Sequence, residues 1–213
     1  MKTIRVNENV IIESYAVGDL GANCYLLIHE ETGEVIVIDP GGSGSILIRR
    51  MLDRGQHVTA IWLTHGHYDH MHHARMVADE FGAPVWIHEK EKDLIKDPDA
   101  NASMLFGYPE IYSADHYFKD DDLLRFADLD IKVIWTPGHT IGGVCFYLER
   151  YGILFSGDTL FRYAQGRTDL KTGSEEDLYR SIRGRLMQLP DDVCVLPGHM
   201  TATTIGNERK RFM

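Results

Sequence analysis

The chain has 213 residues, 44% of them hydrophobic and 25% charged, which are the proportions of an ordinary globular protein and exclude a disordered or fibrous one. Its formal net charge of −10 disfavours nucleic acid as a partner, and no apolar run is long enough to span a bilayer. The first eight residues lack the apolar stretch of a signal peptide, and no Pro-, Gly- or Ser-rich linker divides the chain. We therefore expect a cytoplasmic protein that folds as a single domain over residues 1–213, without nucleic-acid or membrane partners.

Three apolar runs near the N-terminus, at residues 10–15, 24–28 and 34–38, are typical of strands. The third run leads into Asp39-Pro40-Gly41-Gly42. The acid at this point is either a turn signal or a carboxylate that orients a metal-binding histidine. The sequence leaves both interpretations open.

Two helices are predicted in the first half of the chain. Ser45 is expected to cap the first helix, which extends to Arg54, and the second covers residues 72–81. Apolar residues at helical spacing predict the faces that pack against a sheet. These faces consist of Ile46, Leu47, Ile48 and Met51 in the first helix and of Ala74, Val77, Ala78 and Phe81 in the second.

Between these helices lies the stretch on which the functional interpretation depends. Residues 60–63 form an apolar run typical of a buried strand, and Thr64-His65-Gly66-His67-Tyr68-Asp69-His70 follows at once. The backbone turns at Gly66, so three imidazoles and a carboxylate are presented at the end of the strand. Because open sheets build their sites at the carboxyl ends of strands, this cluster predicts a metal site.

The middle of the chain is less regular. Residues 84–88 predict a short strand and residues 89–96 a polar helix. Residues 97–118 contain Pro, Gly and aromatic residues without a clear period. They form either the wall or lid of a substrate pocket or a surface excursion, and we favour the surface excursion.

Regular structure is predicted again in the second half of the chain. Strands are expected at residues 131–135 and 193–196, and a hairpin is expected from residues 144–148 and 153–155. A helix is expected to start at Ser174, whose side chain can cap it.

Metal-competent side chains recur where three of these later strands end. His139 and His199 each follow a Pro-Gly pair, and Asp158 follows Ser156-Gly157. Because strand ends can meet at one edge of a sheet, we expect these residues to converge with the 65–70 cluster. Seven ligands exceed what one zinc ion needs, so the set predicts two ions roughly 3.5–4 Å apart. The predicted division gives His65, His67 and His139 to one ion, Asp69, His70 and His199 to the other, and Asp158 to both as a bridge.

Five further side chains are given mainly structural interpretations. Cys24, Cys145 and Cys194 are far apart in the sequence and are expected to be buried free thiols. His72 and His73 are expected to lie at the surface or to start a helix, although either could add a metal ligand or relay a proton.

Taken as a set, the motifs resemble those of the metallo-β-lactamase-fold hydrolases, and within them the glyoxalase II-like branch. The resemblance covers nearly the whole chain and is carried by Thr-His-Gly-His-Tyr-Asp-His at 64–70, Pro-Gly-His-Thr at 137–140, Ser-Gly-Asp-Thr-Leu-Phe at 156–161, Gly-Arg-Thr-Asp at 166–169, Pro-Gly-His at 197–199 and Thr-Thr-Ile-Gly-Asn-Glu at 203–208. It implies an α/β fold, a four-layer αββα sandwich with the site at one edge. The metal content is expected to be two divalent ions, Zn²⁺ with Fe or Mn as alternatives, because His and Asp ligands suit all three.

The activity that the resemblance implies is that of a dinuclear metal-dependent hydrolase, a hydroxyacylglutathione hydrolase-like thioesterase that cleaves S-acylglutathione-type thioesters with a metal-bridging hydroxide. Asp69 and Asp158 would be the catalytic carboxylates that fix the spacing of the ions. Arg167 lies where glutathione thioesterases place a basic residue towards the substrate, with an ion pair to another acid as the structural alternative. Tyr163 and Lys171 are further candidates for substrate contact.

The chain departs from this branch in three respects. His72-His73 stands where small residues or glycines are usual, and Met200-Thr201 stands where Gly-Pro is usual. Full-length glyoxalase II also has a C-terminal helical region that helps to bind glutathione, so the chain is expected to be a short form without it. These departures affect the shape of the pocket more than metal binding.

Three other activities remain open at this stage. The first is a mononuclear iron persulfide dioxygenase, in which His65, His139 and Asp158 would hold the iron. The second is a metallo-hydrolase of lactones or other esters, and the third a non-catalytic metal-binding module. The complete second set of ligands favours a hydrolase over the dioxygenase.

Overall fold

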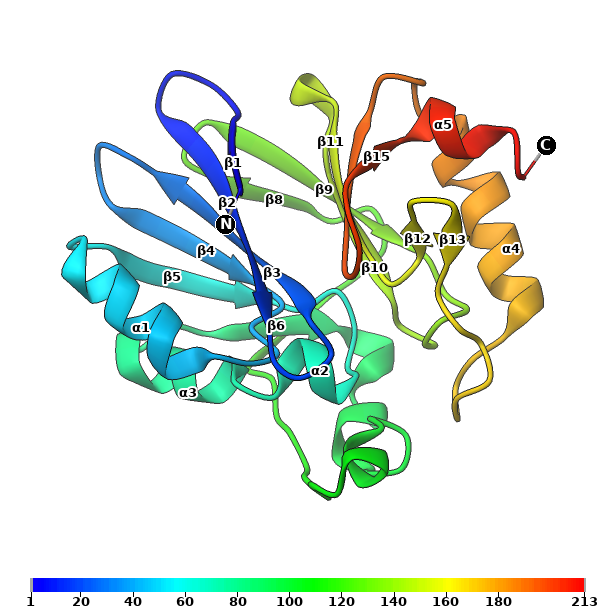
Figure 1. Cartoon of the computed structure of the whole chain (residues 1–213), viewed down its shortest axis with the longest axis horizontal. Coiled ribbons are helices and arrows are strands. Elements are labelled where there is room, and N and C mark those ends of the chain that lie inside the picture. Colours follow the sequence, from blue (N-terminus) through cyan, green and yellow to red (C-terminus); the bar gives the residue numbers. More distant parts are fainter. Residues whose placement is uncertain (1, 213) are drawn as a thin grey trace.

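The computed structural model describes residues 2–212 and shows two sheets packed face to face, with helices on both outer faces (Figure 1). The first sheet has the strand order β1-β2-β3-β4-β5-β6-β7, and the second has the order β15-β14-β11-β10-β9-β8. Helices α1 and α3 cover the first sheet, and α4 and α5 cover the second. These layers confirm the four-layer αββα sandwich.

The bounds of the elements are as follows. The first sheet contains β1 (Lys2–Arg5), β2 (Val10–Val17), β3 (Ala22–His29), β4 (Glu34–Ile38), β5 (His57–Trp62), β6 (Val85–His88) and β7 (His116–Phe118). The second contains β8 (Leu123–Phe126), β9 (Leu129–Trp135), β10 (Val144–Leu148), β11 (Ile153–Gly157), β14 (Cys194–Pro197) and β15 (Thr203–Thr204), and a separate ribbon is formed by β12 (Leu160–Phe161) and β13 (Ala164–Gln165). The helices are α1 (Gly44–Asp53), α2 (Tyr68–Met71), α3 (Ala74–Phe81), α4 (Glu175–Gly184) and α5 (Ile205–Arg209).

Three apolar cores hold the layers together, one between the sheets and one beneath the helices on each side. Strand β3 shows why its sequence is apolar throughout. Cys24, Leu26 and Ile28 pack beneath the helices, whereas Tyr25 and Leu27 pack between the sheets. Because successive side chains of a strand point to opposite faces, a strand buried on both faces must be apolar at nearly every position.

The direction of the strands brings five strand ends to one edge of the sandwich. In the first sheet β4 and β5 are parallel, so Asp39 and the 64–70 loop follow at the same end. In the second sheet β11 is parallel to β14, and β9 runs the same way because both β9 and β11 are antiparallel to β10. These strands lead to His139, Asp158 and His199.

The first helix differs from its prediction. α1 begins at Gly44 with Ser43, not Ser45, at its N-cap position, and the Ser43 side chain makes no capping hydrogen bond. Instead, Nδ1 of His73 accepts the Gly44 N–H at 2.9 Å, so a residue distant in sequence satisfies this end of the helix. Ile46 is 71% exposed and does not pack against the sheet as predicted.

The segment after β6 also differs from its prediction. Residues 89–96 form two short 3₁₀ turns, Glu89–Glu91 and Leu94–Lys96, instead of one polar helix. Because a residue before proline avoids the helical region, Asp97, which has extended backbone before Pro98, stops any continuation. The supposedly irregular 97–118 segment ends in β7, which pairs in parallel with β6.

Other predictions of local structure are confirmed. β10 and β11 form the expected antiparallel hairpin, and Ser174 caps α4 by accepting the N–H of Asp177 at 3.2 Å. Cys24 and Cys145 are buried free thiols, whereas Cys194 is partly exposed. No helix within residues 2–212 has the length and apolar character required to cross a membrane.

Candidate metal centre

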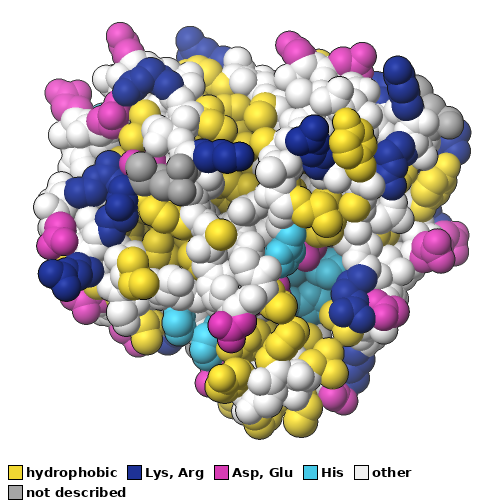
Figure 2. Space-filling view, viewed as in Figure 1, with side chains coloured by type: hydrophobic (Ala, Val, Ile, Leu, Met, Phe, Trp, Pro, Cys, Tyr) yellow, Lys and Arg dark blue, Asp and Glu magenta, His cyan; other side chains and the backbone are white. Residues whose placement is uncertain are grey.

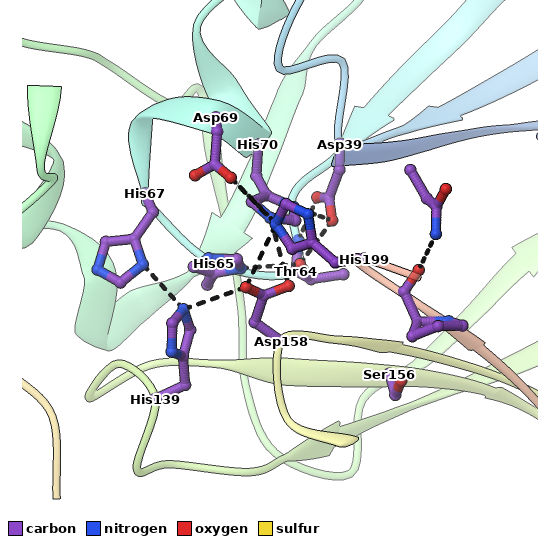
Figure 3. Close-up of polar contacts among 12 residues, drawn as sticks. Asp39, Thr64, His65, His67, Asp69, His70, His139, Ser156, Asp158 and His199 are labelled. Carbon is purple, nitrogen blue, oxygen red and sulfur yellow. Dashed lines mark hydrogen bonds and ion pairs between the residues drawn. The ribbon is translucent and has the colours of Figure 1, made fainter. Parts of the chain in front are cut away.

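The seven predicted ligands face one another at the edge where the two sheets meet (Figure 3). They fall into three groups, and within each group the ligand atoms lie within 4.8 Å of one another. The groups are His65, His67 and His139; Asp69, His70 and His199; and His65, His70 and Asp158. The first two groups are those predicted for the two ions. Asp158 joins a histidine of each, as a bridging carboxylate would.

In two of these histidines the outer ring nitrogen, the one that points away from the other candidate ligands, donates a hydrogen bond to an acceptor. Nδ1 of His139 donates to the backbone carbonyl of Arg167 at 2.8 Å, and Nδ1 of His70 donates to the Asp39 carboxylate at 3.0 Å. A neutral imidazole that carries its proton on the outer nitrogen keeps a lone pair on the inner one. These bonds therefore fix the tautomer and the orientation in which a histidine binds a metal.

Asp39 combines the two interpretations that the sequence left open. It lies in a turn with a positive φ of 54°, and it also orients the site. Its carboxylate accepts the Thr64 N–H at 2.8 Å, the Thr64 hydroxyl at 2.6 Å and the His70 ring at 3.0 Å. Gly41 is required beside it, because a Cβ there would lie 1.5 Å from the backbone oxygen of Asp69.

The arrangement of nitrogens fits bound metal ions. Nε2 of His65 is buried without a hydrogen-bond partner among the described residues, which is costly for a polar atom. Nδ1 of His67 lies 2.9 Å from Nε2 of His139, and Nε2 of His70 lies 3.3 Å from Nε2 of His199. Two nitrogens on one tetrahedral zinc ion lie about 3.3 Å apart, given bonds of about 2.0–2.1 Å. The His70–His199 pair has this separation, and the His67–His139 pair is closer and would need to open slightly to share an ion.

The protonation states of three of these side chains, His65, His67 and Asp158, suit a metal centre. Burial lowers the pKa of His65 and His67, that of His67 to about 3, so both rings are neutral at pH 7. Burial alone would raise the pKa of Asp158, but the adjacent His70 outweighs it and holds that pKa well below its usual range. The same balance holds for His70: burial opposes its charge, but Asp158 and Asp69 outweigh burial and raise its pKa above the usual value, so a bound metal ion would have to displace a proton from this ring. Neutral imidazoles and an ionised carboxylate are the forms that bind cations.

Glu91, which the sequence analysis overlooked, connects two of the ligand loops. Its side chain is fully buried and accepts the Gly66 N–H at 2.7 Å and the Gly142 N–H at 2.6 Å. A Cβ on either glycine would approach a Glu91 oxygen to 2.8 or 2.7 Å, so both positions need glycine. Burial raises the pKa of Glu91 to about 7. The only sequence signal for its burial was the proximity of Glu91 to two apolar residues, Leu94 and Ile95, which the structure shows to be buried as well.

A cavity of about 560 Å³ lies over the centre, and five of the seven candidate ligands line it: His67, Asp69, His139, Asp158 and His199. Figure 2 shows histidine side chains in this hollow, with hydrophobic side chains along its border. Ala102, Leu105 and Phe106 also line it. The preference for a surface excursion at residues 97–118 was therefore wrong, because part of this segment forms a pocket wall.

The three candidate substrate contacts are placed differently. Arg167 lines the cavity, but its guanidinium makes a bidentate ion pair with Asp169 at 2.7 and 2.8 Å. Tyr163 and Lys171 do not line the cavity, and Lys171 is paired with Asp97 at 2.5 Å. The structure thus brings one of the three to the opening.

His72 and His73 lie outside the ligand groups. His73 caps α1, as described above, and Nδ1 of His72 lies 3.3 Å from both Glu110 and the Tyr112 hydroxyl. Both line a second cavity of about 530 Å³ that adjoins the first and shares Leu20, Asp69 and Phe106 with it. Their positions suit helix capping and the wall of this second cavity.

The fold and the centre together define a protein with an αββα sandwich and a histidine- and aspartate-rich metal centre at the shared edge of its sheets. The model of the metallo-beta-lactamase superfamily matches residues 17–199, and the chain belongs to that superfamily. It is a metallo-hydrolase by this membership, and the fold implies divalent metal ions at the centre.

Relatives of known name agree with this assignment. The chain is 35% identical to the hydroxyacylglutathione hydrolase GloC of Haemophilus influenzae, over 93% of this chain and 95% of that protein. It is 34% identical to the probable metallo-hydrolase YqgX of Bacillus subtilis, over 91% and 92%.

Solved structures are similar throughout the chain. The crystal structure of the B3 metallo-beta-lactamase BLEG-1 is 35% identical with a TM-score of 0.87, covering 93% of this chain and 96% of that one. The structure of TTHA1623 in a di-iron-bound form is 31% identical with a TM-score of 0.81, covering 92% and 96%.

Proposed function

We propose that the protein is a thioesterase of the glyoxalase II-like branch, which hydrolyses S-acylglutathione-type thioesters with two bound divalent ions, zinc in the first instance. The observation that carries the proposal is the pair of three-ligand groups joined by Asp158 beneath an open cavity. The similarity to GloC of Haemophilus influenzae supports the choice of substrate class.

In this proposal the bound ions supply a Lewis acid and acidify a water molecule so that it attacks at neutral pH. The chain's own residues orient the candidate ligands and set their protonation states. Asp39 and the Arg167 carbonyl accept hydrogen bonds from Nδ1 of His70 and of His139, which directs the other ring nitrogen, Nε2, towards the ions. Asp158 remains ionised between the two groups. Water adds to the acyl carbon, the C–S bond breaks, and the products are a carboxylate, a thiol and one released proton.

The test is hydrolysis of S-lactoylglutathione and other S-acylglutathiones by zinc-loaded protein, with a chelated sample as control. We expect metal-dependent turnover that Asp158→Ala abolishes, because this change removes the carboxylate shared by both groups. Metal content is measured in both proteins. Turnover that persists in Asp158→Ala would overturn the proposed role of the dinuclear centre.

The same preparation separates the alternatives. Two bound zinc ions without cleavage of any thioester would redirect the search to lactones and other esters. Oxygen uptake with glutathione persulfide by iron-loaded protein would identify a dioxygenase instead.

A further inference from the structure

The cavity above the metal centre combines a polar floor with apolar walls. Candidate ligands form the floor, and among the described residues Gln165 and Arg167 are the only other polar side chains that line it. The apolar side chains of the wall used below are Leu20, Leu105, Phe106, Phe161, Leu170 and Met200. Because Asp169 neutralises Arg167, the walls of the chamber above this floor offer little free charge to a polar group.

Four of these wall residues expose much of their apolar surface. Leu20 is 46% exposed, Leu105 63%, Phe106 39% and Met200 59%. They come from three separate segments: the turn between β2 and β3, the 3₁₀ turn Ser103–Phe106 and the loop after β14. A single exposed apolar residue is ordinary, but convergence of several on one opening indicates a binding surface.

Met200 adds an independent observation. Its φ is 67°, in the left-handed region that a residue with a side chain adopts only at a cost. Backbone strain of this kind gathers at binding and active sites, and Met200 directly follows the candidate ligand His199. Methionine is flexible and suits an apolar ligand of variable shape.

The second cavity differs in character from the apolar chamber. Among its lining residues are Asp19, Ser43, His72 and His73, so it is the more polar of the two and the less suited to an apolar group. In a thioester the acyl group adjoins the carbon that reacts, so the chamber directly over the candidate metal ligands is the one within reach of the acyl group.

We propose, resting on the thioesterase function above, that the apolar chamber is an acyl pocket. It selects thioesters with straight-chain apolar acyl groups over the short, polar lactoyl group. The residues that set this preference are Leu105, Phe106 and Met200 at the mouth of the chamber.

Two series of ligands test the pocket with zinc-loaded protein. The first is binding of acetate, butanoate, hexanoate and octanoate, measured by calorimetry, because these are the carboxylate products and bind whether or not turnover occurs. The second is kcat/KM for the corresponding S-acylglutathiones and for S-lactoylglutathione. We expect carboxylate affinity and kcat/KM to rise about two- to fourfold for each added methylene, since a buried methylene contributes up to about fourfold.

Variants test which residues set the preference for longer acyl chains. Leu105→Ser should flatten both series, whereas Ile46→Ser, a change at a 71% exposed position on α1, should leave them unchanged. Met200→Gly should relieve backbone strain and raise the melting temperature while it flattens the series. A structural role of Met200 alone would not produce that combination.

The outcomes separate the two proposals. A flat carboxylate series overturns the acyl pocket even if S-lactoylglutathione is cleaved. A rising carboxylate series without cleavage of any thioester supports the pocket and overturns the thioesterase function. Equal slopes for Leu105→Ser and wild type would also overturn the assignment of the pocket to this cavity.

Discussion

Glu91 offers the sharpest test of how the metal centre is held together. It accepts one N–H from the loop that carries His65 and His67 and another from the loop that follows His139. Replacing it with glutamine preserves its volume but turns an NH₂ group towards one of the two amides. A buried N–H left without an acceptor costs about 1–3 kcal/mol. We therefore expect Glu91→Gln to lose that much unfolding free energy.

Glu91→Ala removes both acceptors, so about 2–6 kcal/mol follows from the same figure, with a further loss from the cavity that the side chain leaves. Both changes let the two loops shift relative to each other. Loss of a group that orients metal ligands typically costs about 10- to 100-fold in metal affinity. We expect this loss for the group formed by His65, His67 and His139, and a smaller one for the other group.

The assays are urea unfolding of the metal-free protein and competition for zinc against a chelator of known affinity. Glu89→Gln is the matched control, because Glu89 lies two residues away with an exposed side chain. Unfolding free energy and zinc affinity equal to wild type in Glu91→Gln would refute the argument that Glu91 joins the two loops.

Four further outcomes are expected. Because burial raises the pKa of Glu91 from 4.5 to about 7, the folded chain keeps a proton that the unfolded chain loses between these pH values. The unfolding free energy should therefore fall by on the order of 3 kcal/mol as pH rises from 4.5 to 7. Urea titrations of Glu91→Gln at the same pH values should not show this fall. Asp39→Asn should lower zinc affinity about 10- to 100-fold in chelator competition, because the orienting carboxylate of His70 is lost. Chelation should abolish turnover and lower the melting temperature, and free zinc at 100 times its Kd should restore about 2.7 kcal/mol of unfolding free energy for each site that it fills. Gly41→Ala should bind zinc more weakly than wild type because the new Cβ would collide with the Asp69 backbone. Gly184→Ala is the control: its Cβ would meet nothing within 4 Å, so this variant should remain as stable as wild type. Circular dichroism and metal analysis measure both variants.

The convergence of the seven candidate ligands could be predicted from the sequence because each lies in a loop that follows a strand end. Strand ends are marked locally, by an apolar run that stops at Gly or Thr, and parallel strands place such ends at one edge. His139 and His199 were found in this way although they lie far from the 65–70 cluster. The sandwich itself was inferred from the same motifs through family resemblance.

Partners that depend on distant contacts could not be predicted. His73 caps α1 across 29 positions of sequence, and Glu91 serves two loops from a segment that looked like a polar helix. In both cases the side chain accepts hydrogen bonds from backbone N–H groups. Since nearly every residue has a backbone N–H, the sequence does not show which of them need a side-chain acceptor. The cavity wall formed by Ala102, Leu105 and Phe106 was missed for a related reason. Residues that line a pocket do not recur at a regular spacing in the sequence as the buried faces of helices and strands do.

Both sheets supply candidate ligands, and this has a consequence for the order of folding. The first sheet contributes His65, His67, Asp69 and His70, whereas His139, Asp158 and His199 come from the second. Neither three-residue group of the two predicted ions is complete within one sheet. If these residues bind the ions, a chain in which only the first sheet has formed would hold an incomplete coordination shell, and tight metal capture would come late. The metal would then act as a cross-link between the sheets, closing loops of the chain that run from residue 67 to 139 and from residue 70 to 199, and its retention would report that the whole sandwich has assembled.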